Sequence, residues 1–292
     1  MKVSQGDERP VVRALQFRAG TTHLRHLMDG EVGTRGNFML GIWKSEGDFF
    51  SPRHRHNFEQ YRYVLDGELN YNRNGKLTKG MLGYFPEGAA YGPQTSEGRS
   101  ATAVLQFGGA SGGGYLSRQE VEAGREELTK FGSFDGGVFR RRDDSEGRRS
   151  TDAYQAIWEY VHARRMDYPK PRYRDPIMVD PANYEWLAVA GSPGVRQKPL
   201  GTFTERQCAA VLLKLSRGAT YRAGARSVYL FLSGTGIAHD AEFRRWTALH
   251  LDAEETADIV ARDEAEILRL VLPDLTGLEA QVSASTQAAA AE

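Results

Sequence analysis

The chain has 292 residues, of which 40% are hydrophobic and 26% charged, and its 38 basic residues balance its 38 acidic residues. This balance argues against a nucleic-acid partner, and no run of 18 apolar residues predicts a membrane-spanning helix. The length suits one large domain or two of ordinary size. The first residues lack the apolar stretch of a secretory signal and Cys208 is the only cysteine, so we expect a cytoplasmic protein.

Short apolar segments between glycine-rich turns follow an expected N-terminal arm at residues 1–34. This spacing favours an all-β sandwich or barrel over residues 35–108. Asp-Gly at 66–67 and Asn-Gly at 74–75 are hairpin signals. The expected strands are residues 37–43, 60–65, 68–71, 83–85 and 102–107.

Residues 109–180 are expected to form a helical and extended connector that begins in a glycine-rich break. Ser117 starts a Ser-x-x-Glu capping box, which predicts a helix that ends near residue 130. A second helix is expected over residues 152–164, with Thr151 as its N-cap. Four prolines then predict an extended segment.

A second β-rich region is expected over residues 181–275, before a flexible tail at residues 276–292. Cys208 begins the apolar run Cys-Ala-Ala-Val-Leu-Leu, which predicts a buried and inert thiol. The expected strands are residues 196–199, 209–215, 227–232, 246–251 and 265–272.

Two histidines, His54 and His56, are the residues that point most directly to chemistry. On a strand, side chains two residues apart face the same way, so both rings could bind one metal ion. Imidazole is a common ligand of zinc, iron, nickel and copper. The alternative is a metal-free pair of hydrogen-bonded histidines that line a barrel.

The spacing around these histidines resembles the first motif of the cupin superfamily. That motif is a glycine, five residues, His-x-His, three or four residues, a glutamate, six residues and a glycine. Here Gly47, six residues, His54 and His56, three residues, Gln60, six residues and Gly67 follow one another. One gap differs by a single residue, and glutamine replaces the carboxylate.

The second cupin motif is matched further along the chain. It consists of a glycine, five residues, Pro-x-Gly, two residues, a histidine, three residues and an asparagine. Here Gly80, Pro86, Gly88, Tyr91 and Thr95 stand at those spacings, so a tyrosine replaces the histidine. The resemblance implies a mainly β fold of two cupin-type β-barrels, also called jelly rolls, with a short helical connector and a metal near the centre of the first barrel.

The second barrel is predicted to lack a site. Gly218 and Gly234 stand in it as the two glycines of the first motif stand in the first barrel. Aligned in this way, Tyr221, Ala223 and Ser227 take the places of the metal ligands. The resemblance therefore implies a bicupin with one altered metal site and one degenerate barrel.

The resemblance implies Gln60 as a third metal ligand beside the two histidines. A neutral amide would leave the full charge on a divalent ion, which weakens binding and strengthens Lewis acidity. Glu59 is a rival carboxylate, but it is out of phase and should face the other side of the strand. Tyr91 is a candidate ligand or proton carrier, with a hydrogen-bonded wall residue as the alternative.

Arg62 shares the phase of Gln60, so its side chain should point into the barrel. A buried guanidinium needs an anionic partner. That partner is either a substrate carboxylate, which would make Arg62 part of the catalytic site with Tyr91, or an internal carboxylate such as Glu87. His23, with His26 at a three-residue spacing, is a further candidate that could complete the site from the arm.

Two functional hypotheses follow from the resemblance. The first is an enzyme that uses a divalent transition metal (iron, manganese, nickel or zinc) on a small organic acid, phenol or sugar acid. An oxygenase is slightly favoured, with a lyase or isomerase close behind because of Gln60. The second is a non-catalytic bicupin that binds a small-molecule ligand or serves as a scaffold, its metal sites having decayed. A homodimer is expected in either case, because exposed barrel strands often pair between chains.

Overall fold

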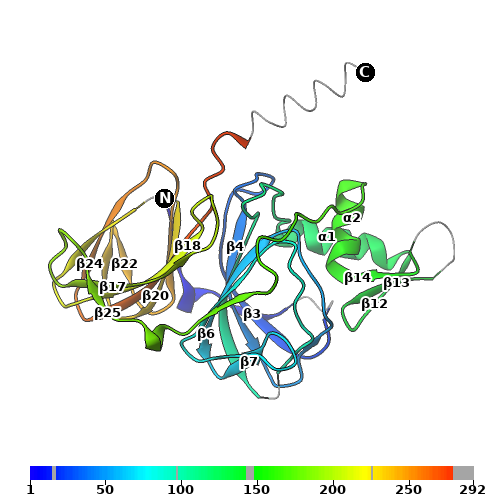
Figure 1. Ribbon diagram of the computed structural model, residues 1–292, viewed down its shortest axis with the longest axis horizontal. Coiled ribbons are helices and arrows are strands. Elements are labelled where there is room, and N and C mark those ends of the chain that lie inside the picture. Colours follow the sequence, from blue (N-terminus) through cyan, green and yellow to red (C-terminus); the bar gives the residue numbers. More distant parts are fainter. Residues whose placement is uncertain (15–17, 97, 143–147, 225, 279–292) are drawn as a thin grey trace.

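The computed structural model describes residues 1–14, 18–96, 98–142, 148–224 and 226–278. Two β-barrels lie next to each other, and two helices with a small sheet cover the side of the first barrel that faces away from the second (Figure 1). Most of the predicted tail, residues 276–292, lies outside the described residues. Two short 3-10 helices, η1 (Gly6–Glu8) and η2 (Pro181–Asn183), complete the regular elements.

The first barrel is built on a seven-stranded antiparallel sheet. Two two-stranded sheets belong to the same barrel. In spatial order, the large sheet comprises β15 (Ile177–Val179), β9 (Leu82–Phe85), β6 (Glu59–Asp66), β11 (Ser100–Phe107), β4 (Phe38–Ser45), β3 (Thr22–Asp29) and β2 (Val11–Arg13). The short sheets pair β7 (Glu68–Asn70) with β8 (Lys76–Thr78) and β5 (Phe50–Ser51) with β10 (Gln94–Thr95).

The second barrel repeats this plan with a seven-stranded and a four-stranded sheet. The large sheet comprises β1 (Lys2–Gln5), β23 (Thr247–Leu251), β20 (Ser227–Ser233), β25 (Ala265–Val271), β18 (Ala209–Leu215), β17 (Val195–Thr202) and β16 (Leu187–Ala188). The smaller sheet comprises β19 (Thr220–Ala223), β24 (Ala257–Ala261), β21 (Gly236–Ala238) and β22 (Ala241–Phe243).

Each large sheet contains one strand from outside its own barrel. β1, at the start of the chain, pairs with β23 of the second barrel. β15, which follows the connector helices, pairs with β9 of the first barrel. The segment expected to form an arm thus supplies β1, β2 and β3. β1 pairs far away in sequence, with Val3 opposite Leu249, whereas β2 pairs with β3 and β3 with β4.

A continuous apolar core joins the two barrels, since their large sheets pack face to face. The ring of Tyr84 in β9 stacks on Phe203, which follows β17, with centroids 4.5 Å apart. Tyr61 in β6 lies against the same ring. Cys208 is fully buried in this core, and burial raises the pKa of its thiol, so the predicted buried and unreactive cysteine agrees with the structure.

The interior of the second barrel is filled with apolar side chains, among them Phe231, Phe243 and Ile259. Phe231 and Phe243 stack at 4.2 Å. Of the residues aligned with the metal ligands, Tyr221 and Ala223 belong to this packed cluster. Because apolar side chains fill the second barrel, we expect the functional site in the first barrel.

Two helices and a three-stranded sheet form the connector. The predicted capping box is confirmed: Ser117 caps α1 (Arg118–Thr129) and Glu120 returns the bond. The N-cap of α2 (Ala153–His162) is Asp152 and not Thr151, because the Asp152 side chain accepts from the N–H groups of Tyr154 and Gln155. Neither helix is long and apolar enough to cross a membrane, in the part of the chain described. The sheet comprises β12 (Gly132–Asp135), β13 (Val138–Arg141) and β14 (Ser150–Asp152).

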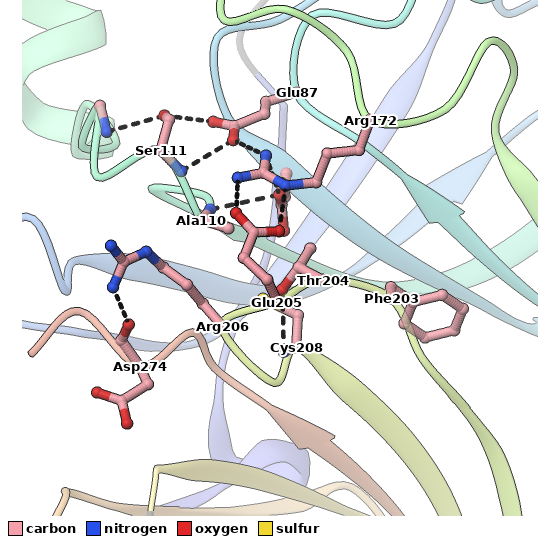
Figure 2. A network of polar contacts seen from close by, with 12 residues as sticks. Glu87, Ala110, Ser111, Arg172, Phe203, Thr204, Glu205, Arg206, Cys208 and Asp274 are labelled. Atoms are coloured by element: carbon pink, nitrogen blue, oxygen red, sulfur yellow. Dashed lines mark hydrogen bonds and ion pairs between the residues drawn. The ribbon is translucent and has the colours of Figure 1, made fainter.

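A charged network ties the connector to both barrels (Figure 2). The Nη1 atom of Arg172 lies 2.6 Å from the fully buried carboxylate of Glu87, and its Nε and Nη2 atoms donate to the two oxygens of Glu205. Glu59, also fully buried, lies 3.9 Å from the same Nη1 atom. Arg172 therefore links the first barrel to a loop of the second.

Candidate ligand site in the first barrel

His54 and His56 lie in the loop between β5 and β6 and not on a regular strand, so that part of the prediction is wrong. The two rings still meet, with centroids 4.9 Å apart. His54 is held by a two-way backbone bridge to Tyr91, in which each N–H donates to the other carbonyl at 3.0 and 2.9 Å. This bridge brings the two sequence motifs together.

Both imidazoles are neutral in this environment. Burial lowers the pKa of His54 and of His56 well below 6.5, and the positive charges of Arg18 and Arg62 act in the same direction. The Nδ1 atom of His54 lies 2.7 Å from the carbonyl of Pro52. The Nδ1 atom of His56 is buried and has no hydrogen-bond partner among the described residues. Neutral rings can accept a metal ion or a ligand proton.

Gln60, Arg62 and Tyr91 form one hydrogen-bonded unit. The amide oxygen of Gln60 accepts from Nε and Nη2 of Arg62 at 3.2 and 2.9 Å, and from Nε2 of Gln106 at 3.2 Å. The Nε2 atom of Gln60 donates to the phenol oxygen of Tyr91 at 2.8 Å, and Nη2 of Arg62 donates to that oxygen at 3.0 Å. Burial raises the pKa of Tyr91, so it stays a neutral phenol.

This unit borders a cavity of about 220 Å³ inside the first barrel. Strand register explains why these side chains face inward together. Gln60 is paired with Gln106, and Arg62 with Val104, which in turn is paired with Gly41. Directly paired residues point to the same face of a sheet, so Gln60 and Gln106 face the cavity together, as do Arg62 and Val104.

The cavity is positively charged. Four of its lining residues, Arg18, Lys44, Arg62 and Arg118, are cationic, and no carboxylate lines it within the described residues. Arg18 pairs with Asp152 at 2.8 Å and Arg118 with Glu122 at 2.6 Å. For Arg62, by contrast, the described residues supply no carboxylate within 4.0 Å: its partners are neutral amides and a phenol.

The residues that are present do not fit a tightly held transition metal. The ligand oxygen that Gln60 would offer already accepts three N–H groups, two of them from a cation. No group of three or more His, Cys, Asp or Glu side chains that could hold a metal ion exists among the residues the structure describes. Catalytic metal sites use about three protein ligands. Two imidazoles beside a guanidinium fall short of that set.

The remaining candidates lie elsewhere. Glu59 faces the other barrel, as its phase predicts, and its carboxylate accepts a bond from the backbone of Ala110. Glu87 pairs with Arg172 and not with Arg62, which corrects one predicted partner. His23 lies 3.7 Å from Glu46.

His26 lies 3.0 Å from Asp29, and neither it nor His23 lines the cavity. Sequence reasoning missed Arg18, Gln94 and Gln106, all of which line the cavity. Gln106 could have been found from its period-two phase along the predicted strand. For Arg18 and Gln94 the sequence carries no signal.

Neither protein-family models nor curated proteins match this chain. Solved structures do. A suggested dioxygenase from Nostoc punctiforme is 12% identical, with a TM-score of 0.62, and the match covers 94% of this chain and 83% of that one. Oxalate decarboxylase from Bacillus subtilis, in which Mn(II) centres are described, is 12% identical with a TM-score of 0.53; the match covers 93% and 77% of the two chains. A protein of Geobacillus kaustophilus is 13% identical with a TM-score of 0.50, over 92% and 93%.

At this level of identity the likenesses show the fold and nothing finer. The predicted fold is confirmed: the chain is mainly β and consists of two cupin-type β-barrels with a short helical connector. A shared fold does not fix the activity or the ligand, which depend on the residues of the cavity itself.

Proposed function

We propose that the first barrel binds a small organic anion and that Arg62 is its principal anchor. The observation that carries this proposal is a guanidinium on the wall of a cavity with only neutral partners among the described residues. Burial of an uncompensated charge is costly, and an anionic ligand would supply the missing partner. This is the ligand-binding alternative that the altered motif left open.

The hydrogen bonds of Arg62 support a defined geometry. A guanidinium has five N–H groups. Nε and Nη2 use three of them on Gln60 and Tyr91, and Nη1 uses one on Gln94 at 3.1 Å. One N–H of Nη1 remains for a ligand oxygen. The guanidinium is thus held in a fixed position by Gln60, Tyr91 and Gln94. This lowers the entropy that the side chain of Arg62 would lose when a ligand binds.

Calorimetric titration with small carboxylates tests the proposal. Benzoate, hexanoate and glucuronate at constant ionic strength would each be titrated into wild-type protein and into Arg62→Met. We expect at least one anion to bind and the variant to bind it about ten-fold or more weakly, because a hydrogen bond to a charged group contributes about 1.5–3 kcal/mol. Arg53→Met, at an exposed arginine, is the matched control.

Arg62→Lys keeps the positive charge but loses the planar guanidinium. It should therefore bind the anion with an affinity between those of the wild-type protein and Arg62→Met. Thermal unfolding of each variant shows whether it is folded. The proposal fails if none of the anions binds the wild-type protein, or if folded Arg62→Met binds as tightly as wild type.

A metal-dependent enzyme is the second candidate function, with an oxygenase slightly ahead of a lyase or isomerase. It is favoured by the Nδ1 atom of His56, which is buried and lacks a partner in the part of the chain that the structure describes, and by the neutral state of both imidazoles. Elemental mass spectrometry on protein purified without chelator tests it, beside a His54→Ala/His56→Ala variant. This candidate would be supported by about one iron, manganese, nickel or zinc ion per chain in the wild-type protein and by its loss in the variant. No metal in either protein would exclude it.

A further inference from the structure

We infer that the ligand of the first barrel is a small aromatic monocarboxylate. This inference rests on the proposed function, because it names the class of anion that Arg62 would hold. The cavity of about 220 Å³ is smaller than the roughly 300–1,000 Å³ of sites for drug-sized ligands. The ligand is therefore a compact molecule, such as one ring with one carboxylate.

One wall of the cavity is built from four interlocked rings. His56 stacks on Phe58 with centroids 4.3 Å apart and an interplanar angle of 21°. Tyr115 and Tyr154 each meet Phe58 edge-on at 5.1 Å, with angles of 83° and 77°. All four line the cavity. Such a wall offers both ring edges and ring faces, and edge-to-face or offset contacts are the arrangements that another aromatic ring prefers.

Trp43 adds a fifth ring from the large sheet. Trp43 pairs with Thr102 of β11, and Thr102 pairs with Val64 of β6. Val64 follows Arg62 by two residues, so Trp43 and Arg62 face the same side of the sheet. Trp43 lines the cavity, where its indole offers a further aromatic surface to a ligand ring.

The other walls disfavour two competing classes of anion. Most of the lining surface is apolar, with Leu24, Met39 and Leu69 among its residues, so the many hydroxyl groups of a sugar acid would find fewer hydrogen-bond partners there than in water. An aliphatic acid would bury its chain but would have to fix several rotatable bonds, and it would gain no ring–ring contacts. An aromatic carboxylate avoids both costs.

Three anions of equal charge separate these classes: benzoate, hexanoate and glucuronate, titrated calorimetrically into the wild-type protein at constant ionic strength. We expect benzoate to bind at least about five-fold more tightly than either of the others. Trp43→Leu should weaken benzoate binding more than hexanoate binding. Trp186→Leu, which removes an indole that does not line the cavity, is the control and should change neither.

The outcomes distinguish this inference from the function on which it rests. If hexanoate or glucuronate binds as tightly as benzoate, the aromatic class is wrong while anion binding at Arg62 stands. If no anion binds, both fail. Should Trp43→Leu not fold, the ranking of the three anions in the wild-type protein decides alone.

Discussion

The Nη2 atom of Arg62 lies 3.0 Å from the phenol oxygen of Tyr91 and donates a hydrogen bond to it. The same Nη2 atom also donates to Gln60, so one guanidinium contacts both side chains that stand where the cupin motifs have a glutamate and a histidine. The two replacements are therefore linked, because the amide of Gln60 and the phenol of Tyr91 both provide neutral acceptors for the same cation. A carboxylate and an imidazole at these places would instead complete a metal site.

Gln60→Glu should convert the site from anion binding towards metal binding. The new carboxylate would neutralise Arg62 at the distance that now separates it from the amide oxygen, and it would restore the motif's ligand. We expect benzoate affinity to fall about ten-fold or more, measured by calorimetry, and bound zinc or manganese to rise, measured by elemental mass spectrometry. Gln197→Glu, on the second barrel, is the control; unchanged benzoate affinity in Gln60→Glu would refute this view of the site.

Tyr91→Phe should destabilise the fold by about 1–3 kcal/mol, because Nε2 of Gln60 and Nη2 of Arg62 would lose a buried acceptor. Urea unfolding measures the loss. Since burial raises the pKa of the Tyr91 phenol, this residue should show less phenolate absorbance at pH 10 than a free tyrosine does, and none near neutral pH. A difference spectrum between wild type and variant that reveals phenolate near neutral pH would contradict the neutral assignment.

Glu59→Gln should stabilise the protein at pH 8 but not at pH 4. Burial and the nearby charge of Glu87 raise the pKa of Glu59 from 4.5 to about 7. Between pH 4.5 and about pH 7 the unfolded chain releases this proton, whereas the folded chain keeps it. The free energy of unfolding of the wild-type protein therefore falls by about 3 kcal/mol as the pH rises through this range. The variant should lack this decline. Glu68→Gln, at an exposed position, should retain it.

Arg172→Ala should cost about 3–5 kcal/mol of unfolding free energy, because it leaves the carboxylate of Glu87 buried and unpaired. Glu205→Ala removes the exposed partner of the same guanidinium and should cost no more than about 1 kcal/mol. Chemical unfolding of the two variants gives the comparison. Equal losses would mean that the bond to Glu87 contributes little.

Asp152→Ala should lower stability more than Thr151→Ala does. Asp152 caps α2 through the N–H groups of Tyr154 and Gln155 and also pairs with Arg18. Loss of an N-cap costs about 0.5–2 kcal/mol. Thermal unfolding would show the order of the two variants, and the reverse order would restore Thr151 as the cap.

Local rules predicted the parts of this structure that depend on neighbours in sequence. The alternation of strand side chains placed Arg62 in the barrel and Glu59 on its outer face, and the capping box located α1. Contacts between residues that are distant in sequence could not be predicted in this way. Nothing near Glu87 indicates that Arg172 is its counter-ion, and nothing near Val3 indicates a place opposite Leu249.

The loop that carries His54 and His56 shows a second limit. Period-two spacing is compatible with a strand, but the backbone around these residues follows the single bridge to Tyr91 and the bend after Pro52. The site and its central cation, Arg62, could be located from the first motif. Two further cations of the lining, Arg18 and Arg118, come from segments outside both motifs and could not be predicted to lie there.

The reciprocal placement of β1 and β15 makes the barrels interdependent. A chain cut within residues 163–176 would yield two fragments, each of which supplies an edge strand to the sheet of the other. Such fragments should remain associated after cleavage, held by main-chain hydrogen bonds as well as by the shared apolar core. Nicked protein would then migrate as an intact particle in gel filtration and separate only in denaturant, and the two halves of this molecule would behave as one cooperative folding unit.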